Sequence, residues 1–418
     1  MHLFITDARV DGARKKGNAI SSLLTIQITF VFINMASRSG GGMMDVVWLK
    51  KDVRLHDHGP FAEAAKGSRP FCVVYIYEPD QLSHHSVHGS HVHFANEGIV
   101  DLDMTLRRLT CSKSSFCITL AKGRAADIFS ELHRSRKISR ILAHEETGHN
   151  VSYARDRAVR RWCRGNNVSF VEFNQTGVTR GLKNRDNFTR LYNVFMSKNQ
   201  HRTPSAEQLS ATMLNASHFA SIHVGLQIPG KDLPWIPQEH VNDREQRQRG
   251  GETLALTCLE TFLARRGEGY SRGISSPITA WSSCSRLSPY FTFGHISLRR
   301  VMQKLKARQE NARQRRKIAK KGAKDGWLKS LASFSSRLRW RSHFIQKFEN
   351  EVSMEHTAQC RAYDDLRRGE GEWNEAHFKA WKHGKTGFPM VSFFRFCTLL
   401  LYDRALFTES NIFRSMRA

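Results

Sequence analysis

Between residues 45 and 173, short apolar runs alternate with amphipathic segments, and this alternation constrains the fold more than any other feature of the sequence. The apolar runs are rich in β-branched and aromatic residues and are bounded by polar turns, as buried strands are. The segments between them carry apolar side chains at helical spacing. The predicted strands are residues 45–49, 71–77, 116–120, 138–143 and 168–173, and the predicted helices are residues 61–66, 91–109, 125–133 and 153–163.

Strands that alternate with helices predict an α/β domain with a doubly wound parallel sheet. Ligands of such sheets bind beyond the carboxyl ends of the strands. The loops that follow Leu49, Tyr77 and Ala143 are therefore candidate ligand-binding loops. No Gly-x-Gly-x-x-Gly motif follows the first strand, which argues against an ordinary dinucleotide-binding fingerprint.

The second half of the chain has helical patterns and no convincing strand pattern, so we expect an all-α domain there. Helices are predicted over residues 252–266, 297–318 and 329–348. The preceding segment is polar and rich in proline, which is typical of a connection between domains. The expected regions are an extension outside the fold (1–43), the α/β domain (44–174), an interdomain connection (175–249), a partial helical domain (250–391) and a tail (392–418).

The extension contains a mostly apolar run at residues 20–36 that follows three basic residues. The run is short for a membrane span, and it loosely resembles a signal or transit segment. We favour a natural start at Met43 or Met44, with a targeting segment as the alternative. The eight cysteines are scattered and form no C-x-x-C motif, which predicts a reduced, intracellular and non-secreted protein; cytoplasm, nucleus and organelle stay open.

The charge is strongly unbalanced, with 65 Lys and Arg against 38 Asp and Glu and a formal net charge of +27. Such an excess is costly through self-repulsion, and a polyanionic partner such as nucleic acid explains it most easily. A basic protein without a specific partner is the alternative. We expect no membrane partner and a monomer.

Residues 267–294 are dense in Gly, Ser, Pro and aromatic residues, so they do not form one long amphipathic helix. Small residues let a backbone approach a bound group closely. Within four positions, Ser285, Arg286 and Ser288 offer two hydroxyls and a guanidinium, which can hold a pyrophosphate without a P-loop. An ordinary loop rich in turn-forming residues is the alternative.

Five segments resemble, in order, the photolyase/cryptochrome family. They are WLKKDVRLHDHGPF; LAHEETG followed by RDRAVRRWC; RGEGYSRGISSP with CSRLSPYFTFGHISLRRV; RLRWRSHFIQKFE; and FKAWKHGKTGFPMV. The resemblance covers roughly residues 45–391 and implies an α/β antenna domain followed by an all-α FAD-binding domain. After residue 391 the family's pattern is not found, which predicts a truncated flavin pocket that holds FAD loosely.

The resemblance also implies roles for particular residues. Trp340 corresponds to the tryptophan beside flavin and substrate, and Trp381 to an outer electron-relay position, although an ordinary surface or core aromatic is favoured for Trp381. Cys284 stands where Thr or Ser is common, which removes a good hydroxyl donor. The implied FAD-binding residues are Tyr270, Cys284, Ser285, Arg286, Leu287, Ser288 and Arg341.

The implied activity is light-driven DNA repair, in which reduced flavin passes an electron to a pyrimidine dimer flipped from damaged DNA. Arg337 is a departure from this pattern, because many pyrimidine-dimer photolyases have a Glu there that accepts hydrogen bonds from the bases, and Arg has no acceptor. The alternatives are a cryptochrome-like blue-light receptor without repair activity and an inactive family member.

Two further expectations concern bound groups. A second antenna chromophore of the folate or deazaflavin type is found in the family, and this sequence does not identify it. Five histidines lie between His84 and His93, but no carboxylate or cysteine is positioned with them in the sequence, so we expect a polar loop and no metal site.

Overall fold

The computed structural model describes residues 42–112, 116–243, 245–318, 326–364, 373–388 and 391. The predicted tail at residues 392–418 and nearly all of the predicted extension lie outside the described residues. The chain divides into two units, Met1–Gly42 and Met43–Ala418, and the second contains all the secondary structure described below. No helix in the described part of the chain is both long and apolar enough to cross a membrane.

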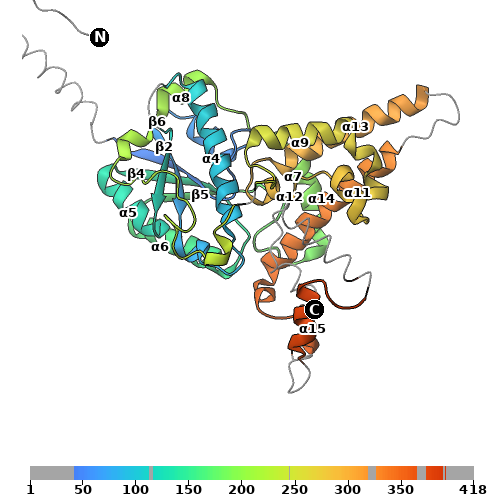
Figure 1. The fold of residues 1–418 in the computed structure, drawn as a ribbon. Coiled ribbons are helices and arrows are strands. Elements are labelled where there is room, and N and C mark those ends of the chain that lie inside the picture. Colours follow the sequence, from blue (N-terminus) through green and yellow to red (C-terminus); the bar gives the residue numbers. More distant parts are fainter. Residues whose placement is uncertain are drawn as a thin grey trace, which may run out of the picture. The chain divides into compact units, whose positions relative to one another are not determined.

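A parallel sheet forms the first half of the unit, with strand order β3-β2-β1-β4-β5 (Figure 1). In register, Val46 of β1 lies between Cys72 of β2 and Ile141 of β4. A short strand from the predicted connection, β6, pairs with the start of β2. The bounds are β1 Met44–Leu49, β2 Phe71–Tyr77, β3 Ile118–Lys122, β4 Ile138–His144, β5 Ser169–Phe173 and β6 Met213–Leu214.

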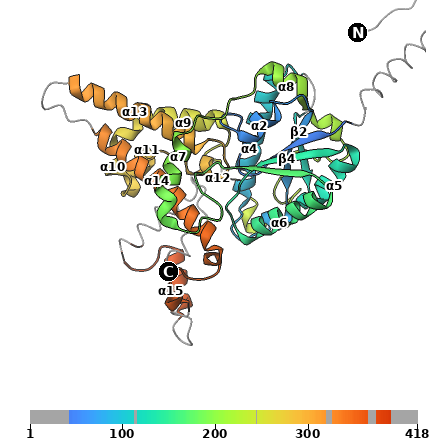
Figure 2. The ribbon, with the colours of Figure 1, turned by 180° about the vertical axis from the view of Figure 1, so that it is seen from behind.

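Helices cover both faces of this sheet, because successive side chains of a strand point to opposite faces. Val46 and Trp48 pack with buried residues of α5 (Ala125–Ser135) and α6 (Asn150–Gly165). Val47 and Leu49 pack with residues of α2 (Gly59–Ala64) and α4 (Gly89–Leu109). Figures 1 and 2 show α5 and α6 together on one side of the sheet, and α4 with α8 (Ala206–Thr212) on the other. The predicted doubly wound fold is confirmed.

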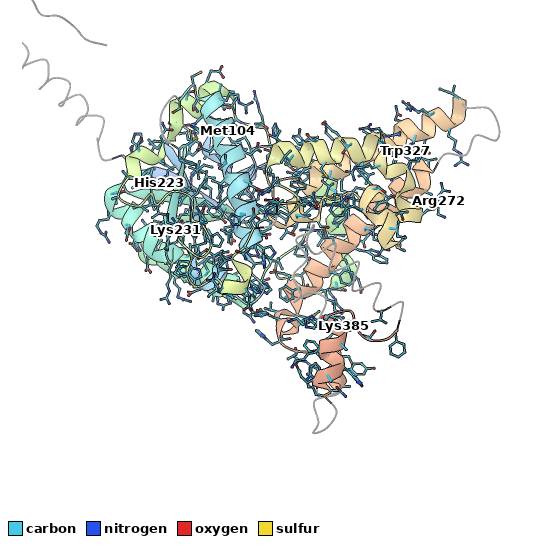
Figure 3. All side chains as sticks on the ribbon, viewed as in Figure 1. Met104, His223, Lys231, Arg272, Trp327 and Lys385 are labelled. Carbon is cyan, nitrogen blue, oxygen red and sulfur yellow. The ribbon has the colours of Figure 1, made fainter. Side chains whose placement is uncertain are left out.

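The second half is helical, and its described residues from 250 onward contain no strand. The ring of Phe262 on α9 lies 4.7 Å from that of Phe334 on α14, and Tyr270 packs edge-on against both. At the start of α14, Arg308 of α13 lies 4.1 Å above the ring of Trp327, which Figure 3 labels. The helices are α7 Phe188–Ser197, α9 Glu252–Ala264, α10 Tyr270–Gly273, α11 Pro277–Ser283, α12 Ser288–Thr292, α13 Leu298–Ile318, α14 Trp327–Asn350 and α15 Glu375–Lys382, with α3 (Pro79–Leu82) in the first half.

The loop between β1 and α2 joins the two halves. The backbone N–H of Leu55 donates to Glu252 Oε2 at 2.8 Å, and Arg54 donates to the Gly294 carbonyl at 2.9 Å. Asp57 accepts hydrogen bonds from Arg299 and Ser297, both at the start of α13 or just before it. These charged groups are buried, so the loop and the helical half satisfy each other's polar groups.

His295 lies at the same junction and makes the stability of the unit depend on pH. Its Nδ1 accepts the Gly251 N–H at 3.0 Å, and burial, with Arg54 nearby, lowers its pKa to about 3. An unfolded histidine takes up a proton below about pH 6.5, whereas this one stays neutral in the fold to about pH 3, so stability falls as pH falls through that window. We expect His295→Gln to reduce the slope of unfolding free energy against pH by roughly 1 kcal/mol per pH unit.

The measurement is urea unfolding at several pH values between pH 6.5 and pH 4. His218→Gln is the matched control, because His218 is exposed and should leave the slope unchanged. Equal slopes for the parent and His295→Gln would show that His295 does not titrate differently in the two states.

Candidate functional site

Residues 267–294 fold into short helices joined by a turn at 284–288, as the absence of a long helical pattern indicated. Arg286 adopts a φ of 63°, which is uncommon for a residue other than glycine. The Leu287 N–H points back to Ser285 Oγ at 3.4 Å. Leu287 is fully buried, whereas Ser288 is exposed at the start of α12. The buried side chain of Leu287 therefore holds the turn in place, and the hydroxyl of Ser288 lies on the surface.

The backbone of this turn is held by α9 and the residues around it. The Cys284 carbonyl accepts from Arg266, and the Ser285 carbonyl accepts from Cys258 Sγ at 3.2 Å. Arg286 donates from Nε to Gln248 at 3.2 Å, and its guanidinium lies over the Trp281 ring. The carbonyls of Cys284 and Ser285 thus have protein partners, and the hydroxyls of Ser285 and Ser288 are among the donors that could meet a ligand.

Tyr270 connects this turn to α14. Its ring is buried, and burial raises the pKa of the phenol to about 12, with Cys284 adding to the rise and Arg337 opposing it. The phenol remains protonated and a hydrogen-bond donor at neutral pH.

One face of α14 is open in the described part of the chain. Trp340 is 47% exposed and Phe344 is 61% exposed, one turn apart on the helix. The Arg337 guanidinium lies 4.7 Å above the Trp340 ring. Next to them, Arg341 donates to the Phe291 carbonyl at 3.3 Å, and burial lowers its pKa to about 10. Arg341 thus ties this face to α12, where Ser288 lies.

Contacts link α12 and α10 of the predicted flavin site to α14, whereas Trp381 lies on another helix, α15. Trp381 lies on α15, none of whose residues is buried, with its ring 6.2 Å from Phe378 of the same helix. Its electron-relay role stays a prediction, as do the individual roles of the other site residues.

A cavity of about 250 Å³ lies at the carboxyl edge of the sheet. Its wall includes Lys51 after β1, Tyr77 at the end of β2 and Glu146 after β4, which are the loops that the strand order singled out. Phe293 from the helical half also lines it.

A charged cluster forms the polar wall of this cavity. Arg155 donates to Glu78 at 3.1 Å and to Glu146 at 2.7 Å. Burial raises the pKa of Glu78 to about 7, whereas Arg155 and two lysines outweigh burial and lower the pKa of Glu146. The cavity therefore offers one carboxyl group that can hold a proton near neutral pH beside one that stays ionised.

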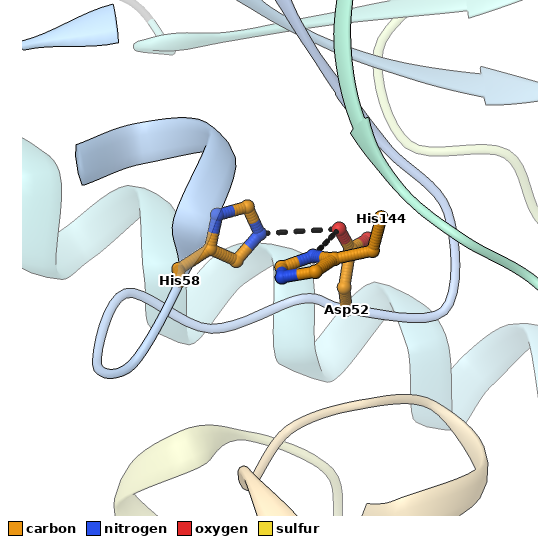
Figure 4. Close-up of side chains that lie close together, drawn as sticks. All are labelled: Asp52, His58 and His144. Carbon is orange, nitrogen blue, oxygen red and sulfur yellow. Dashed lines mark hydrogen bonds and ion pairs between the residues drawn. The ribbon is translucent and has the colours of Figure 1, made fainter. Parts of the chain in front are cut away.

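The sequence reasoning missed a buried cluster of Asp52, His58 and His144 next to this edge (Figure 4). Asp52 Oδ2 accepts from His58 Nε2 at 3.1 Å and from His144 Nδ1 at 2.7 Å, and Oδ1 accepts the Lys50 N–H at 2.6 Å. His58 Nδ1 accepts the Phe61 N–H, so the proton of the neutral ring is on Nε2.

These bonds make the cluster a closed hydrogen-bonded set and not a metal site. Burial lowers the pKa of both histidines, that of His144 to about 3, so both rings are neutral donors to one carboxylate. A cation would have to displace those buried protons. The sequence signal was available, since Asp52 follows β1 and His144 ends the neighbouring β4.

Comparisons with known proteins agree with this fold. The family model for DNA photolyase matches residues 45–213, and that for the FAD binding domain of DNA photolyase matches residues 334–392. Cryptochrome-1 of Drosophila melanogaster is 24% identical over 83% of this chain and 66% of its own length. Cryptochrome-1 of Gallus gallus is 24% identical over 84% of this chain and 55% of its own length. The chain thus spans between about half and two thirds of the length of these relatives.

Two solved structures share the fold. A cryptochrome from Synechocystis has a TM-score of 0.62 at 18% identity and covers 86% of this chain and 71% of its own. An archaeal photolyase from Sulfolobus tokodaii, solved with two FAD molecules, has a TM-score of 0.58 at 23% identity and covers 84% of this chain and 69% of its own. A parallel α/β domain followed by a helical flavin-binding region defines a class of light-responsive flavoproteins. The chain belongs to the photolyase/cryptochrome family.

The donor chemistry of the site fits FAD. Ser285 and Ser288 supply hydroxyls and Arg286 a cation, which suit a pyrophosphate. Trp340 presents a partly exposed ring on α14, which suits a planar apolar ring system. Cys284 fits FAD less well, because its thiol is a poor hydrogen-bond donor at a position where a hydroxyl is expected.

Proposed function

We propose that this chain is a FAD-dependent blue-light receptor of the cryptochrome type. The observation that carries the proposal is the Arg337 guanidinium, 4.7 Å above the Trp340 ring on the open face of α14. Arg337 places five N–H donors and no acceptor where a dimer photolyase needs an acceptor for the damaged bases. It also covers the ring face on which an extruded base would stack.

Bound FAD would supply light absorption and one-electron chemistry. The chain's own residues bind and orient it: Ser285, Arg286 and Ser288 are the candidates for the pyrophosphate. Tyr270 is buried and protonated, and it would support the turn at residues 284–288. Trp340 would help to exclude water from the ring system of a bound flavin.

Light-driven repair of pyrimidine dimers is the second candidate, favoured by the positive charge of α13. Its exposed cations can neutralise phosphates of a DNA backbone. On this reading the partner is damaged DNA, bound by a monomer. The exposed cations of the helix are Lys306, Arg313, Arg315, Arg316 and Lys317.

The test is repair of a thymine-dimer oligonucleotide under blue light by the FAD-loaded chain. We expect repair by Arg337→Glu to be at least roughly tenfold faster than the slow repair by the parent, because a charged hydrogen bond to the bases contributes about 1.5–3 kcal/mol. Arg337→Lys is the matched control, since it keeps a cation without an acceptor. Visible flavin absorbance per chain separates poor FAD loading from absent repair in every variant. Repair by the parent at the rate of Arg337→Glu would favour the photolyase candidate instead.

We further propose the cavity at the sheet edge as the site of a second chromophore. The support is its position among the loops after β1, β2 and β4 and its aromatic and ionisable wall. The archaeal neighbour is described as implicating a novel light-harvesting cofactor. The folate and deazaflavin types both remain open for this cavity. An intracellular location is proposed on the seven free thiols among the described residues.

A further inference from the structure

A second cavity lies at the amino edge of the sheet, where the parallel strands begin. Its wall includes Arg69 before β2, Arg140 in the first turn of β4's course, and Arg164 near the end of α6. The hydroxyls of Ser139 in β4 and Ser169 in β5 also line it. As far as the described residues form it, the wall of this amino-edge cavity holds three arginines and no acidic side chain.

Two of these guanidinium groups are held by one buried carboxylate. Asp45 of β1 is fully buried, and its Oδ1 accepts from Arg69 Nη1 at 3.1 Å. Its Oδ2 accepts from Arg140 Nη2 at 2.6 Å and from Nε at 3.0 Å, and Glu63 accepts from Arg140 Nη1 at 3.3 Å. Each guanidinium has five N–H groups, so donors remain beyond those that the carboxylates use. The side chains of Arg69 and Arg140 are 40% and 27% exposed, so both are fixed in place and still accessible from solvent.

Arg164 adds a third cation, at the carboxyl end of α6. It is exposed, and its side chain forms no ion pair with the described residues. A helix carboxyl end ordinarily repels an anion, because its last carbonyl groups have no partner. Here the Trp162 carbonyl accepts the Asn166 N–H at 3.1 Å, and the Cys163 carbonyl accepts the Val168 N–H at 2.9 Å. These hydrogen bonds weaken the repulsion that the end of α6 would exert on an anion.

The chain around the amino-edge cavity is strongly basic. Residues 63–70, 131–140 and 160–169 form this edge, and they contain nine Lys and Arg against two Asp and Glu. The buried Asp45 adds only one further acid. Lys137, which directly precedes β4, is an exposed cation beside the cavity. Such an excess is costly through self-repulsion, and a bound anion would relieve it.

We propose that the amino-edge cavity binds a phosphate group through Arg69, Arg140 and Arg164, with the hydroxyls of Ser139 and Ser169 as further donors. The planar fork of a guanidinium matches two phosphate oxygens, and a phosphate has enough oxygens to accept from several arginines at once. The phosphate belongs either to a nucleic-acid backbone or to a small phosphorylated compound, which present the same chemistry to these donors. The site lies at the opposite edge of the sheet from the proposed chromophore cavity, and the proposal does not depend on flavin binding.

The test is phosphate binding by the 418-residue chain, measured with two probes at about 0.15 M salt, where distant surface charges are screened. Inorganic pyrophosphate is titrated by calorimetry. A fluorescein-labelled single-stranded DNA of about 12 nucleotides, free of pyrimidine dimers, is followed by fluorescence anisotropy. We expect the parent to bind pyrophosphate, and Arg164→Glu to weaken that binding at least about tenfold, because it replaces a charged donor by a repelling carboxylate.

Lys137→Glu distinguishes the two sources of the phosphate. Because Lys137 lies beside the cavity and does not line it, pyrophosphate binding should stay within about twofold of the parent. A nucleic-acid backbone that continues past the cavity would meet Lys137, so DNA binding should then fall in this variant and in Arg164→Glu. DNA binding that neither substitution changes, together with the loss of pyrophosphate binding in Arg164→Glu, identifies a small phosphorylated compound.

Arg157→Glu is the matched control, because Arg157 is an exposed arginine on the same helix that does not line the cavity. It makes the same change in net charge and should leave the pyrophosphate affinity within about twofold of the parent. Circular dichroism identifies a variant that fails to fold, and Arg164→Gln decides if Arg164→Glu does so. No pyrophosphate binding by the parent, unchanged binding in the Arg164 variant, or an equal loss in Arg157→Glu would overturn the proposal.

Discussion

Gly294→Ala is expected to destabilise the protein by at least about 4 kcal/mol, because two separate costs fall on one methyl group. The backbone there has a φ of 66°, which costs a residue with a Cβ atom roughly 1 kcal/mol. The added Cβ would also stand 2.1 Å from the Lys51 carbonyl oxygen and 2.4 Å from Asp52 Cα. Both are backbone atoms of the loop that joins the two halves, so neither can move aside alone.

Gly181→Ala is the control that separates the two costs. Its φ is 67°, and nothing lies within 4 Å of the place that the added methyl group would take, so only the backbone cost applies. Urea unfolding should give a loss of about 1 kcal/mol for this variant. A similar loss in both variants would show that the β1–α2 loop can move away from the helical half at little cost.

Asp52→Ala is expected to cost about 4 kcal/mol of unfolding free energy, because it leaves three buried donors without an acceptor. These donors are the Lys50 N–H, His58 Nε2 and His144 Nδ1. Each unsatisfied buried group costs about 1–3 kcal/mol. All three lie where β1 and β4 end, so the loss should also loosen the wall of the sheet-edge cavity.

The measurement is again urea unfolding, with Asp186→Ala as control. Asp186 is exposed, and such surface substitutions change stability by about 0.5 kcal/mol or less. If the two aspartate variants unfold at the same urea concentration, the cluster of Asp52, His58 and His144 does not stabilise the fold.

The fold could be predicted from the sequence because its information is local. The run from Asp45 to Leu49 alternates between two buried faces, and the structure places it in β1, at the centre of the sheet. The two-residue strand β6 could not be predicted, because Met213 and Leu214 carry no period and pair with β2 only through tertiary contact. The backbone conformation of residues 284–288 could not be predicted either, because an arginine in a sequence does not indicate a positive φ.

The candidate sites were predictable only where their residues are close in sequence. Ser285, Arg286 and Ser288 form one motif, and a resemblance could point to them. Glu355 lies about 200 positions or more after both His84 and His149, and no spacing rule connects it with them. No carboxylate stands beside these histidines in the sequence, whereas in space Glu355 lies beside His84 and His149; the expected absence of a metal site stays a prediction.

The loop between β1 and α2 has a consequence for how this protein can be recombined. Asp57 and Arg54 are buried charges whose partners include Arg299 and the Gly294 carbonyl in the other half. In a chimera whose α/β half comes from another family member, the β1–α2 loop of that member would pack against a helical half whose polar groups match the loop of this protein. An exchange of the α/β half should therefore give a folded protein only when residues 250–299 are exchanged together with the loop. The exchangeable segment thus extends beyond the end of the sheet.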